Sequence, residues 1–201
     1  MQHPYFRIVV GTVAVLVVIV VAVVAYVVTD FRNSPGMSEG APQASGLSLS
    51  SPAFENNGSI PAKYTADGAN VSPPLQWQGV PAGTKTFALF VEDQDAPNGA
   101  FTHWLIADMP AQVSALPEGI AAQDVVSGAV TAVQGENGFR KPGYGGPQPP
   151  AGKPHRYSFR LYALDDRLDM PGGFSKGQFR AAIAHHVLGE AMLVGRYGRS
   201  Q

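Results

Sequence analysis

Cysteine is absent from all 201 positions of this sequence. No disulfide framework is therefore available, no lipid can be attached through a cysteine thiol, and sulfur says nothing about the redox compartment. The chain also lacks an excess of charge, since 14 basic residues stand against 15 acidic ones for a net charge of −1. Because the basic residues are scattered, the sequence excludes an electrostatic nucleic-acid surface.

Charge is missing most completely near the amino terminus, where residues 8–28 are almost all Val, Ile, Leu and Ala. A run of this length matches a helix that crosses ~30 Å of hydrocarbon. It has no polar face, which argues against a core helix of the folded domain. We predict a transmembrane anchor at 8–28 after a flank at 1–7. A cleavable signal peptide is the alternative, although its apolar region usually has only about 7–15 residues.

The residues on either side of this run indicate its orientation. Arg7 and the free amino group precede it, whereas charges of both signs follow it. The more positively charged flank of a membrane span usually stays in the cytoplasm. We therefore expect a single-pass protein of the cell membrane with a cytoplasmic N-terminus. Its domain would be extracytoplasmic, either periplasmic or on the outer face, and secreted if the segment is cleaved. Residues 29–46 are rich in Pro, Gly and Ser and predict a flexible linker, so the folded domain is expected at 47–201.

The most informative stretch runs from Phe87 to Asp108 and predicts two strands joined by a polar turn. Both faces of the first strand are apolar, which is typical of a strand at the centre of a sheet. Turn residues at 97–99, followed by extended patterning, favour an antiparallel hairpin. Such pairing brings Asp93 and His103 to the same end of the sheet, where we expect the functional site.

Short runs of extended patterning recur through the rest of the domain. They predict strands at 47–50, 60–64, 75–77, 124–133, 156–164 and 190–197, of which 124–133 is interrupted by Gly128. Lys176 to Leu188 gives the one convincing helix of the domain. Ser175 and Gln178 have the spacing of a capping box, and Gly189 suits a carboxy-terminal cap. Many short strands and one late helix indicate an all-β protein, an antiparallel β-sandwich with a C-terminal helix.

A long segment between the strands, residues 134–154, has many glycines and prolines and almost no apolar period. Segments of this length without regular structure are uncommon in compact domains and often line binding sites. Within it, the glycines of 143–150 would let backbone N–H groups approach a ligand, and the prolines would hold the shape of the loop. We therefore expect this loop beside the functional site.

The side chains best suited to chemistry are Asp93, Asp95, His103, His155 and Tyr157. A protonated imidazole held by a carboxylate can donate hydrogen bonds to an anion such as phosphate. Histidine and carboxylate also bind zinc, but the spacing carries no metal-site signature, so we expect neither a metal nor a cofactor. On residue type alone, a structural role for a lone histidine or aspartate stays the simpler interpretation.

These residues belong to a pattern that resembles the phosphatidylethanolamine-binding protein family, and most closely its bacterial Raf kinase inhibitor-like branch. The pattern covers about Leu47 to Arg199. Its motifs are Asp93-Gln-Asp-Ala-Pro97, His103-Trp104, Gly146-Pro-Gln-Pro-Pro150 and His155-Arg-Tyr157, supported by Ile60–Tyr64, Asp67–Trp77, Tyr162–Asp165, His186–Ala191 and Gly195–Arg199.

The resemblance implies a β-sandwich with a small anion-accepting pocket at one end of the sheet. Carried over by position, the ligand-binding residues would be Asp93, His103, Gly146, Pro147, His155 and Tyr157, with Asp95, Pro97, Tyr144 and His186 as further candidates. In this family a cis peptide bond precedes the proline that Pro97 matches. Gln94 departs from the pattern, because the family usually has proline there, and the change is expected to loosen the backbone.

Several of these residues also have structural interpretations. Asp95, just before Ala-Pro, is equally suited to capping the turn. Trp104 alternates away from His103 and is expected in the core. His186 falls on the apolar stripe of the predicted helix, where a buried structural histidine is the simpler prediction, and His185 is expected to face solvent.

The resemblance implies a membrane-tethered protein that binds a phosphorylated head group or another small anion, and related bacterial proteins suggest a homodimer. The alternative is an interaction module that inhibits a protease or a kinase through the pocket rim and residues 134–154. An enzyme is not expected. Gly173-Phe-Ser-Lys-Gly177 matches the G-x-S-x-G nucleophile pattern, but no convincing buried strand precedes it and Ser175 is better used as the helix cap.

Overall fold

The computed structural model describes residues 46–199. The predicted flank and anchor, and all but the last residue of the predicted linker, lie outside this range. No helix between residues 46 and 199 has both the length and the apolar character that a membrane crossing requires.

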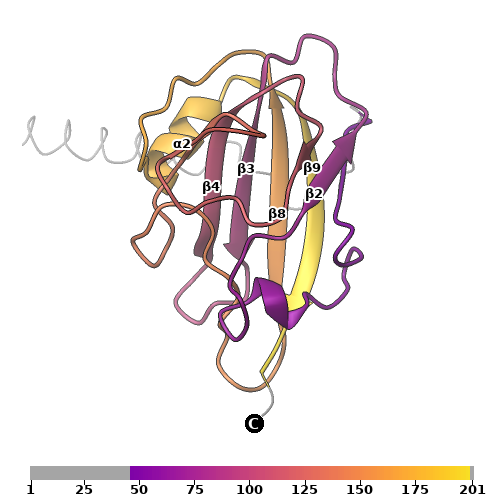
Figure 1. The fold of residues 1–201 in the computed structure, drawn as a ribbon, viewed down its shortest axis with the longest axis vertical. Coiled ribbons are helices and arrows are strands. Elements are labelled where there is room, and N and C mark those ends of the chain that lie inside the picture. The colour runs from indigo at the N-terminus through magenta and orange to yellow at the C-terminus, as the bar shows by residue number, and fades with distance from the viewer. Residues whose placement is uncertain (1–45, 200–201) are drawn as a thin grey trace, which may run out of the picture. The chain divides into compact units, whose positions relative to one another are not determined.

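Two antiparallel sheets make up the domain (Figure 1). The larger sheet has the strand order β6 (Val125–Val126), β7 (Ala132–Gln134), β4 (Phe101–Pro110), β3 (Thr86–Asp93), β8 (His155–Leu164) and β9 (Val187–Tyr197). The smaller sheet has the order β1 (Ser48–Ser50), β2 (Leu75–Gln78) and β5 (Ala115–Leu116). The described residues also form one α-helix, α2 (Lys176–Ile183), and one 3-10 helix, η1 (Ala62–Tyr64). The predicted all-β, antiparallel class is confirmed.

The central position predicted for the first strand of the hairpin is also confirmed. β3 pairs with β4 on one side and with β8 on the other, and all eight of its residues are buried. Its odd-numbered side chains face the smaller sheet, where Phe87 contacts Trp77 with ring centroids 5.3 Å apart. Trp104 lies in the same core, as its alternation predicts.

The other face of the large sheet is covered by α2. Phe179 is fully buried and packs against Phe90 and Tyr162 of the sheet and against Phe174, with centroids 6.0, 6.2 and 6.0 Å apart. Ser175 caps the helix in the predicted capping box with Gln178. Both faces of β3 are therefore buried away from solvent, which explains why its sequence does not alternate between apolar and polar residues.

The helix is shorter than its sequence pattern predicts, and it precedes the last strand of the domain. It ends at Ile183, and β9 begins at Val187, so Gly189 is not a helix cap. Gly189 instead pairs with Ala163 in the β8–β9 ladder. His186 consequently does not lie on a helix; its Nδ1 is 2.8 Å from Asp165 Oδ1. His185 is exposed, as predicted.

Two predicted strands also differ from the structure. Residues 60–64 do not form an edge strand: Ile60 donates to the Arg196 carbonyl, and the chain then turns into η1. The run 124–133 does not form one strand, because β6 and β7 pair with each other and Gly128, with φ of +123°, lies between them. Glycine adopts that backbone conformation at little cost, so the interruption in the pattern is a reversal of the chain.

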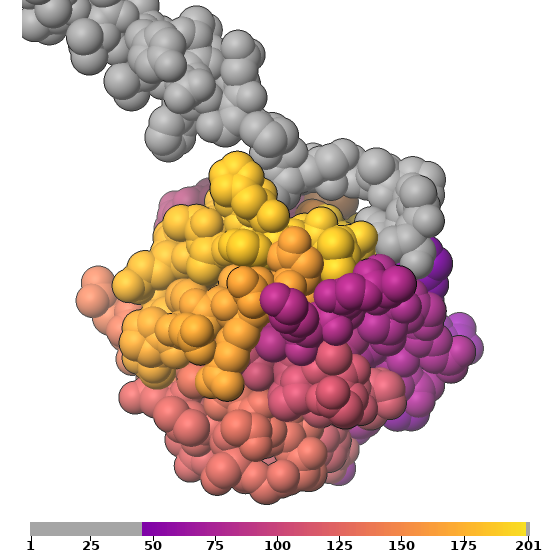
Figure 2. Space-filling model, turned by 90° about the horizontal axis from the view of Figure 1, so that it is seen from above, coloured from indigo at the N-terminus to yellow at the C-terminus, as the bar shows by residue number. Residues whose placement is uncertain are grey.

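The two ends of the large sheet are built from different parts of the chain. Figure 2 shows one end, where the yellow segment that includes the turn into β9 meets the magenta segment that leads into β3. At the other end, β3 finishes while β4 and β8 begin. This second end brings together the residues that the sequence singles out.

Candidate functional site

A cavity of about 170 Å³ lies at the end of the large sheet where β3 finishes. The core-facing positions of β8 run through Phe159 and Tyr157 to His155, and those of β3 end at Asp93. Polar side chains thus replace apolar ones at the last core-facing positions of both strands. The cavity is lined by Asp93, Ala96, Pro97, Phe101, His103, Phe139, Gln148, Pro149, Pro150 and His155.

His103 reaches this cavity through an irregularity in the β3–β4 ladder. Val91 pairs with Trp104 and Glu92 pairs with Thr102, so His103 is an extra residue in β4. Such a bulge bends a strand and redirects a side chain. The predicted convergence of Asp93 and His103 on one sheet end is confirmed, since both line the cavity.

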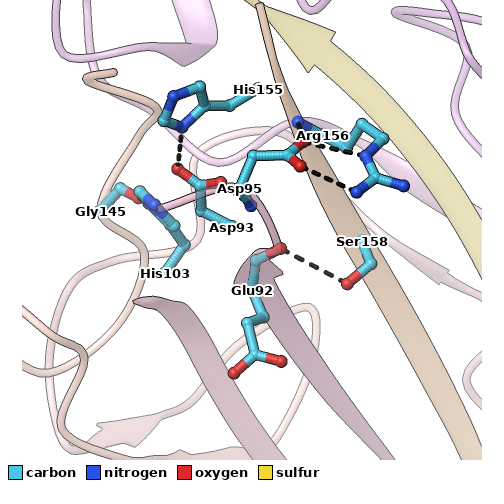
Figure 3. Close-up of polar contacts among 8 residues, drawn as sticks. All are labelled: Glu92, Asp93, Asp95, His103, Gly145, His155, Arg156 and Ser158. Carbon is cyan, nitrogen blue, oxygen red and sulfur yellow. Dashed lines mark hydrogen bonds and ion pairs between the residues drawn. The ribbon is translucent and has the colours of Figure 1, made fainter. Parts of the chain in front are cut away.

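His155 is held by Asp93, as Figure 3 shows. Its Nδ1 lies 2.8 Å from Asp93 Oδ2, and both side chains are largely buried. The other Asp93 oxygen accepts a hydrogen bond from the Asp95 backbone N–H at 2.9 Å. Because an ionised carboxylate can only accept, the proton in the His155–Asp93 contact sits on Nδ1, and Nε2 is the remaining ring nitrogen.

His103 is fixed in the same tautomer by a different partner. Its Nδ1 lies 2.5 Å from the Gly145 carbonyl oxygen, so Nδ1 carries a proton and donates it. The residue is 3% exposed. Burial lowers the pKa of His103 below its ordinary value, although the Gly145 carbonyl and the charge of Asp93 act in the opposite direction.

Tyr157 lies directly behind these two histidines. Its ring meets the His103 ring edge to face at 5.1 Å, and it stands opposite Asp93 in the β3–β8 ladder. Its hydroxyl is buried and forms no hydrogen bond of ordinary geometry within residues 46–199, but it lies close enough to the Asp93 carboxylate for a contact between them to help raise its pKa. Burial and the negative charge of Asp93 raise the pKa of Tyr157, which keeps the hydroxyl protonated. A buried donor without a partner costs free energy unless a ligand satisfies it.

The predicted rim residues Gly146 and Pro147 are buried anchors of the loop and not part of the cavity lining. The Gly146 N–H donates to Asn70 Oδ1 at 2.7 Å, and the Pro147 carbonyl accepts from the Ala66 N–H at 3.0 Å. These two bonds fix the loop so that the next three residues, Gln148 to Pro150, form the wall.

An aromatic wall closes another side of the cavity. The Phe101 and Phe139 rings meet edge to face with centroids 4.8 Å apart, and both rings contact His103, at 5.2 and 5.8 Å. Phe139 is 40% exposed at this position. Sequence reasoning missed both phenylalanines. Their signal is weak, because an isolated aromatic residue in a Gly-rich loop is normally attributed to packing.

Asp95 does not join the cavity. Figure 3 shows its carboxylate directed at Arg156, and the Arg156 Nε and Nη2 atoms lie 2.9 and 2.8 Å from its two oxygens. The Arg156 guanidinium lowers the pKa of Asp95 to about 2. Through this pairing with Arg156, Asp95 fixes the start of β8.

Within residues 46–199, no three metal-ligating side chains are close enough together to hold an ion.

Four other expectations concern neighbours of the site. The Gln94 N–H donates to the Arg156 carbonyl at 3.0 Å, so this residue adds a bond and does not loosen the backbone. Pro97 lines the cavity, but its peptide bond is trans, like every other one between residues 46 and 199. Tyr144 is buried and donates to the Tyr64 carbonyl at 2.7 Å. His186, beyond the far end of β8, is not at the site.

A model of the phosphatidylethanolamine-binding protein family matches residues 50–198, and the chain therefore belongs to this family. It is 47% identical over 154 residues to a protein of Methanothermobacter thermautotrophicus named UPF0098 protein, which covers 76% of this chain and 99% of that relative. It is 38% identical over 158 residues to LppC of Mycobacterium tuberculosis, named as a candidate lipoprotein, with 78% and 75% covered.

The fold agrees with a solved structure of the same family. The crystal structure of Escherichia coli YbcL, described as a new member of the mammalian family, matches with a TM-score of 0.72 at 30% identity. The match covers 77% of this chain and 99% of YbcL.

Proposed function

We propose that this protein binds the phosphate of a phosphorylated head group, or another small anion, in the cavity at the end of the large sheet. The observation that carries this proposal is the shared arrangement of two imidazoles. The Nδ1 atom of His103 donates to the Gly145 carbonyl, and that of His155 donates to Asp93. Both side chains line the cavity. On protonation, Nε2 becomes a donor, and a charge-assisted hydrogen bond to an anion is about twice as strong as a neutral one.

The size of the cavity and the state of Asp93 support the same proposal. A volume of about 170 Å³ is below the ~300 Å³ at which drug-sized pockets begin, so the cavity suits a head group and not a whole lipid. Both Asp93 oxygens already accept hydrogen bonds, from the Asp95 N–H and from His155. This carboxylate therefore holds the imidazole in position and does not face an incoming anion unpaired.

The proposal is of binding without catalysis, by a domain tethered to the membrane through residues 8–28. The Ser175 hydroxyl, at the centre of the nucleophile-like motif, lies in the capping box of α2 and accepts from the Gln178 N–H. Tethering is supported by the uncharged apolar run at 8–28. The name of the Mycobacterium tuberculosis relative is consistent with membrane association.

A second candidate function, inhibition of a protease or a kinase, is favoured by Phe139. This side chain is 40% exposed at the cavity mouth, within the 134–154 loop. Exposed aromatic side chains often act as anchors in protein interfaces. Inhibition that persists in a His103→Ala, His155→Ala variant but is lost in Phe139→Ala would assign it to the rim and not to the anion cavity.

Titration calorimetry of the full chain with phosphate and with phosphoethanolamine tests the main proposal. We expect saturable binding that is weakened in the His103→Ala, His155→Ala variant, because the cavity no longer contributes to it. His186→Ala is the matched control, because His186 also holds an aspartate through Nδ1 at 2.8 Å but lies beyond the opposite end of β8. Absence of binding between pH 5 and pH 8, a range around the ordinary histidine pKa of ~6.5, would refute the proposal.

A further inference from the structure

A second concave surface lies close to the cavity along the chain, and its charged side chains are a lysine and an arginine. It is a groove of about 410 Å³ whose lining includes Lys153, Pro154, Arg196 and Gly198. The chain connecting the two sites is short, since Pro150 lines the cavity and Lys153 lines the groove. The segment from Pro149 to Pro154 therefore separates the two sites at the same end of the large sheet.

The groove contains two cations that lack an ionic partner. Within residues 46–199, neither Lys153 nor Arg196 forms a salt bridge or a side-chain hydrogen bond to an acidic group. Their cationic neighbours are neutralised: Arg156 is paired with Asp95, and Arg199 with Asp67. The groove lining thus contains two cations that no acidic side chain of residues 46–199 neutralises.

The placement of Arg196 adds to this concentration of charge. It stands directly opposite Arg156 in the β8–β9 ladder, and like charges opposite each other destabilise a sheet. Asp95 binds the Arg156 guanidinium, so only one member of the pair is compensated within the described residues. A local arrangement that opposes stability without an evident compensation is expected mainly at functional positions.

The backbone of the groove is fixed before any ligand arrives. The Arg196 N–H donates to the Gly58 carbonyl, and the Arg196 carbonyl accepts from the Ile60 N–H, both at 2.8 Å. Gly198 lets the end of β9 approach Pro154, because a Cβ at this position would lie 2.9 Å from Pro154 Cγ. The end of β9 and the 149–154 segment are therefore held together closely, and little ordering is needed on binding.

We propose that Lys153 and Arg196 form an anion subsite in this groove that binds a phosphate monoester group. The planar guanidinium of an arginine can bind two phosphate oxygens at once, and the lysine adds a mobile point charge. The phosphate can belong to a soluble ester or to a lipid head group at a membrane surface. This subsite does not depend on anion binding in the cavity, because it uses none of the cavity's side chains.

Nuclear magnetic resonance of the full, 15N-labelled chain in nonionic detergent can locate anion binding residue by residue. Glycerol 1-phosphate is titrated while the amide signals of Lys153 and Gly198 report on the groove and that of Gly145 reports on the cavity. We expect saturable shifts of the groove signals in the wild-type chain and in the His103→Ala, His155→Ala variant. In the wild-type chain, groove signals that respond while the cavity signal does not would count against the proposed function and leave the subsite standing.

The Lys153→Gln, Arg196→Gln variant provides the decisive comparison. We expect the affinity measured from the groove signals to fall about tenfold or more, as for the loss of hydrogen bonds to a charged group. Lys85→Gln, Arg167→Gln is the matched control, because it removes the same charge from exposed positions next to the opposite end of the sheet. Groove signals that do not respond in the wild-type chain, or that respond equally in both variants, would overturn the subsite.

The source of the phosphate is distinguished by placing the full chain in lipid nanodiscs. One set contains phosphatidylcholine alone and the other adds phosphatidic acid, whose phosphate is a monoester, with no soluble ester in either. A shift of the groove signals that requires the anionic lipid assigns the subsite to a membrane surface. A response to glycerol 1-phosphate alone assigns it to a soluble ester, and no response to either probe refutes it.

Discussion

Tyr157 stands directly opposite Asp93 where β8 pairs with β3, and its buried hydroxyl forms no hydrogen bond of ordinary geometry among the described residues. Replacement by phenylalanine removes only that hydroxyl. If the hydroxyl donates to the bound anion, Tyr157→Phe should weaken phosphate binding about tenfold, the effect of one hydrogen bond to a charged group. Calorimetry on the full chain measures this change.

Stability separates this role from a structural one. Because the hydroxyl forms no hydrogen bond of ordinary geometry within residues 46–199, its removal should leave the free energy of unfolding unchanged or slightly higher. Urea denaturation of both proteins provides the comparison. Unchanged phosphate affinity would show that the hydroxyl does not reach the ligand, and a large loss of stability would show that it has a structural partner.

The pH dependence of anion binding follows from the burial of His103. Burial lowers its pKa, so the free protein holds a neutral imidazole above the ordinary value of ~6.5. The fold is stabilised by the neutral form, and this contribution is lost as the pH falls through the lowered pKa. An anion that accepts from the imidazolium reverses this preference, so binding should be coupled to proton uptake and tighten as the pH falls.

Sulfate is the appropriate probe for this coupling, because its charge stays constant between pH 5 and pH 8 whereas that of phosphate does not. We expect the rise in melting temperature on adding sulfate to be larger at pH 5.5 than at pH 8. His103→Ala, His155→Ala should abolish the difference, and His186→Ala should retain it. A sulfate effect that is equal at both pH values would show that neither imidazole binds the anion in its protonated form.

The Asp95–Arg156 pair should make the fold sensitive to acid. The pKa of Asp95 falls from its ordinary 3.8 to about 2 in the folded chain, so the stabilisation is present above pH 3.8 and is lost as the pH falls toward 2. Because Arg156 is half exposed, solvent screening reduces the expected contribution to about 1 kcal/mol.

Asp95→Asn should therefore lower the free energy of unfolding at pH 7 by about that amount and have less effect near pH 2. Asp169→Asn is the control, because Asp169 forms only an exposed pair with Arg167 and asparagine tolerates its positive φ of 48°. Equal effects of the two substitutions at pH 7 would mean that the Asp95 pair is as weak as an ordinary surface pair.

Alternation along the strands predicted much of the site. Asp93 ends the apolar core face of β3, and Tyr157 and His155 continue the core face of β8, so the period of two places all three together. The same alternation predicted the burial of Trp104. The alternation of side chains was enough to predict these positions because β3 and β8 are long strands, each paired on both sides.

The features that the sequence did not predict, or predicted wrongly, arose where tertiary pairing decided the structure. The bulge that redirects His103 exists only in the ladder between two strands, and neither strand's own pattern reveals it. Gly189 has the chemistry of a helix cap, but pairing with Ala163 extends β9 in its place. Phe139 lies against the histidines because a loop distant in sequence folds over the sheet end.

Gly145 links that loop to His103, and it leaves little room for a side chain. A Cβ at this position would lie 2.7 Å from Phe139 Cδ2, so Gly145→Ala should displace the Phe139 ring or the carbonyl that orients His103. We expect phosphate affinity to fall severalfold while the fold is retained, since the nearest atoms belong to a partly exposed side chain.

Removal of the phenylalanine ring should relieve this clash. In Gly145→Ala, Phe139→Ala, the remaining close contact is with Asn137 Nδ2 at 3.3 Å, which a small shift accommodates. Phosphate affinity should therefore recover to the level of Phe139→Ala alone, as measured by calorimetry on the three variants. If the double variant binds as weakly as Gly145→Ala, the loss comes from the altered Gly145 backbone and not from the ring. In that case the hydrogen bond from His103 to the Gly145 carbonyl, and not the aromatic wall, sets the geometry of the cavity.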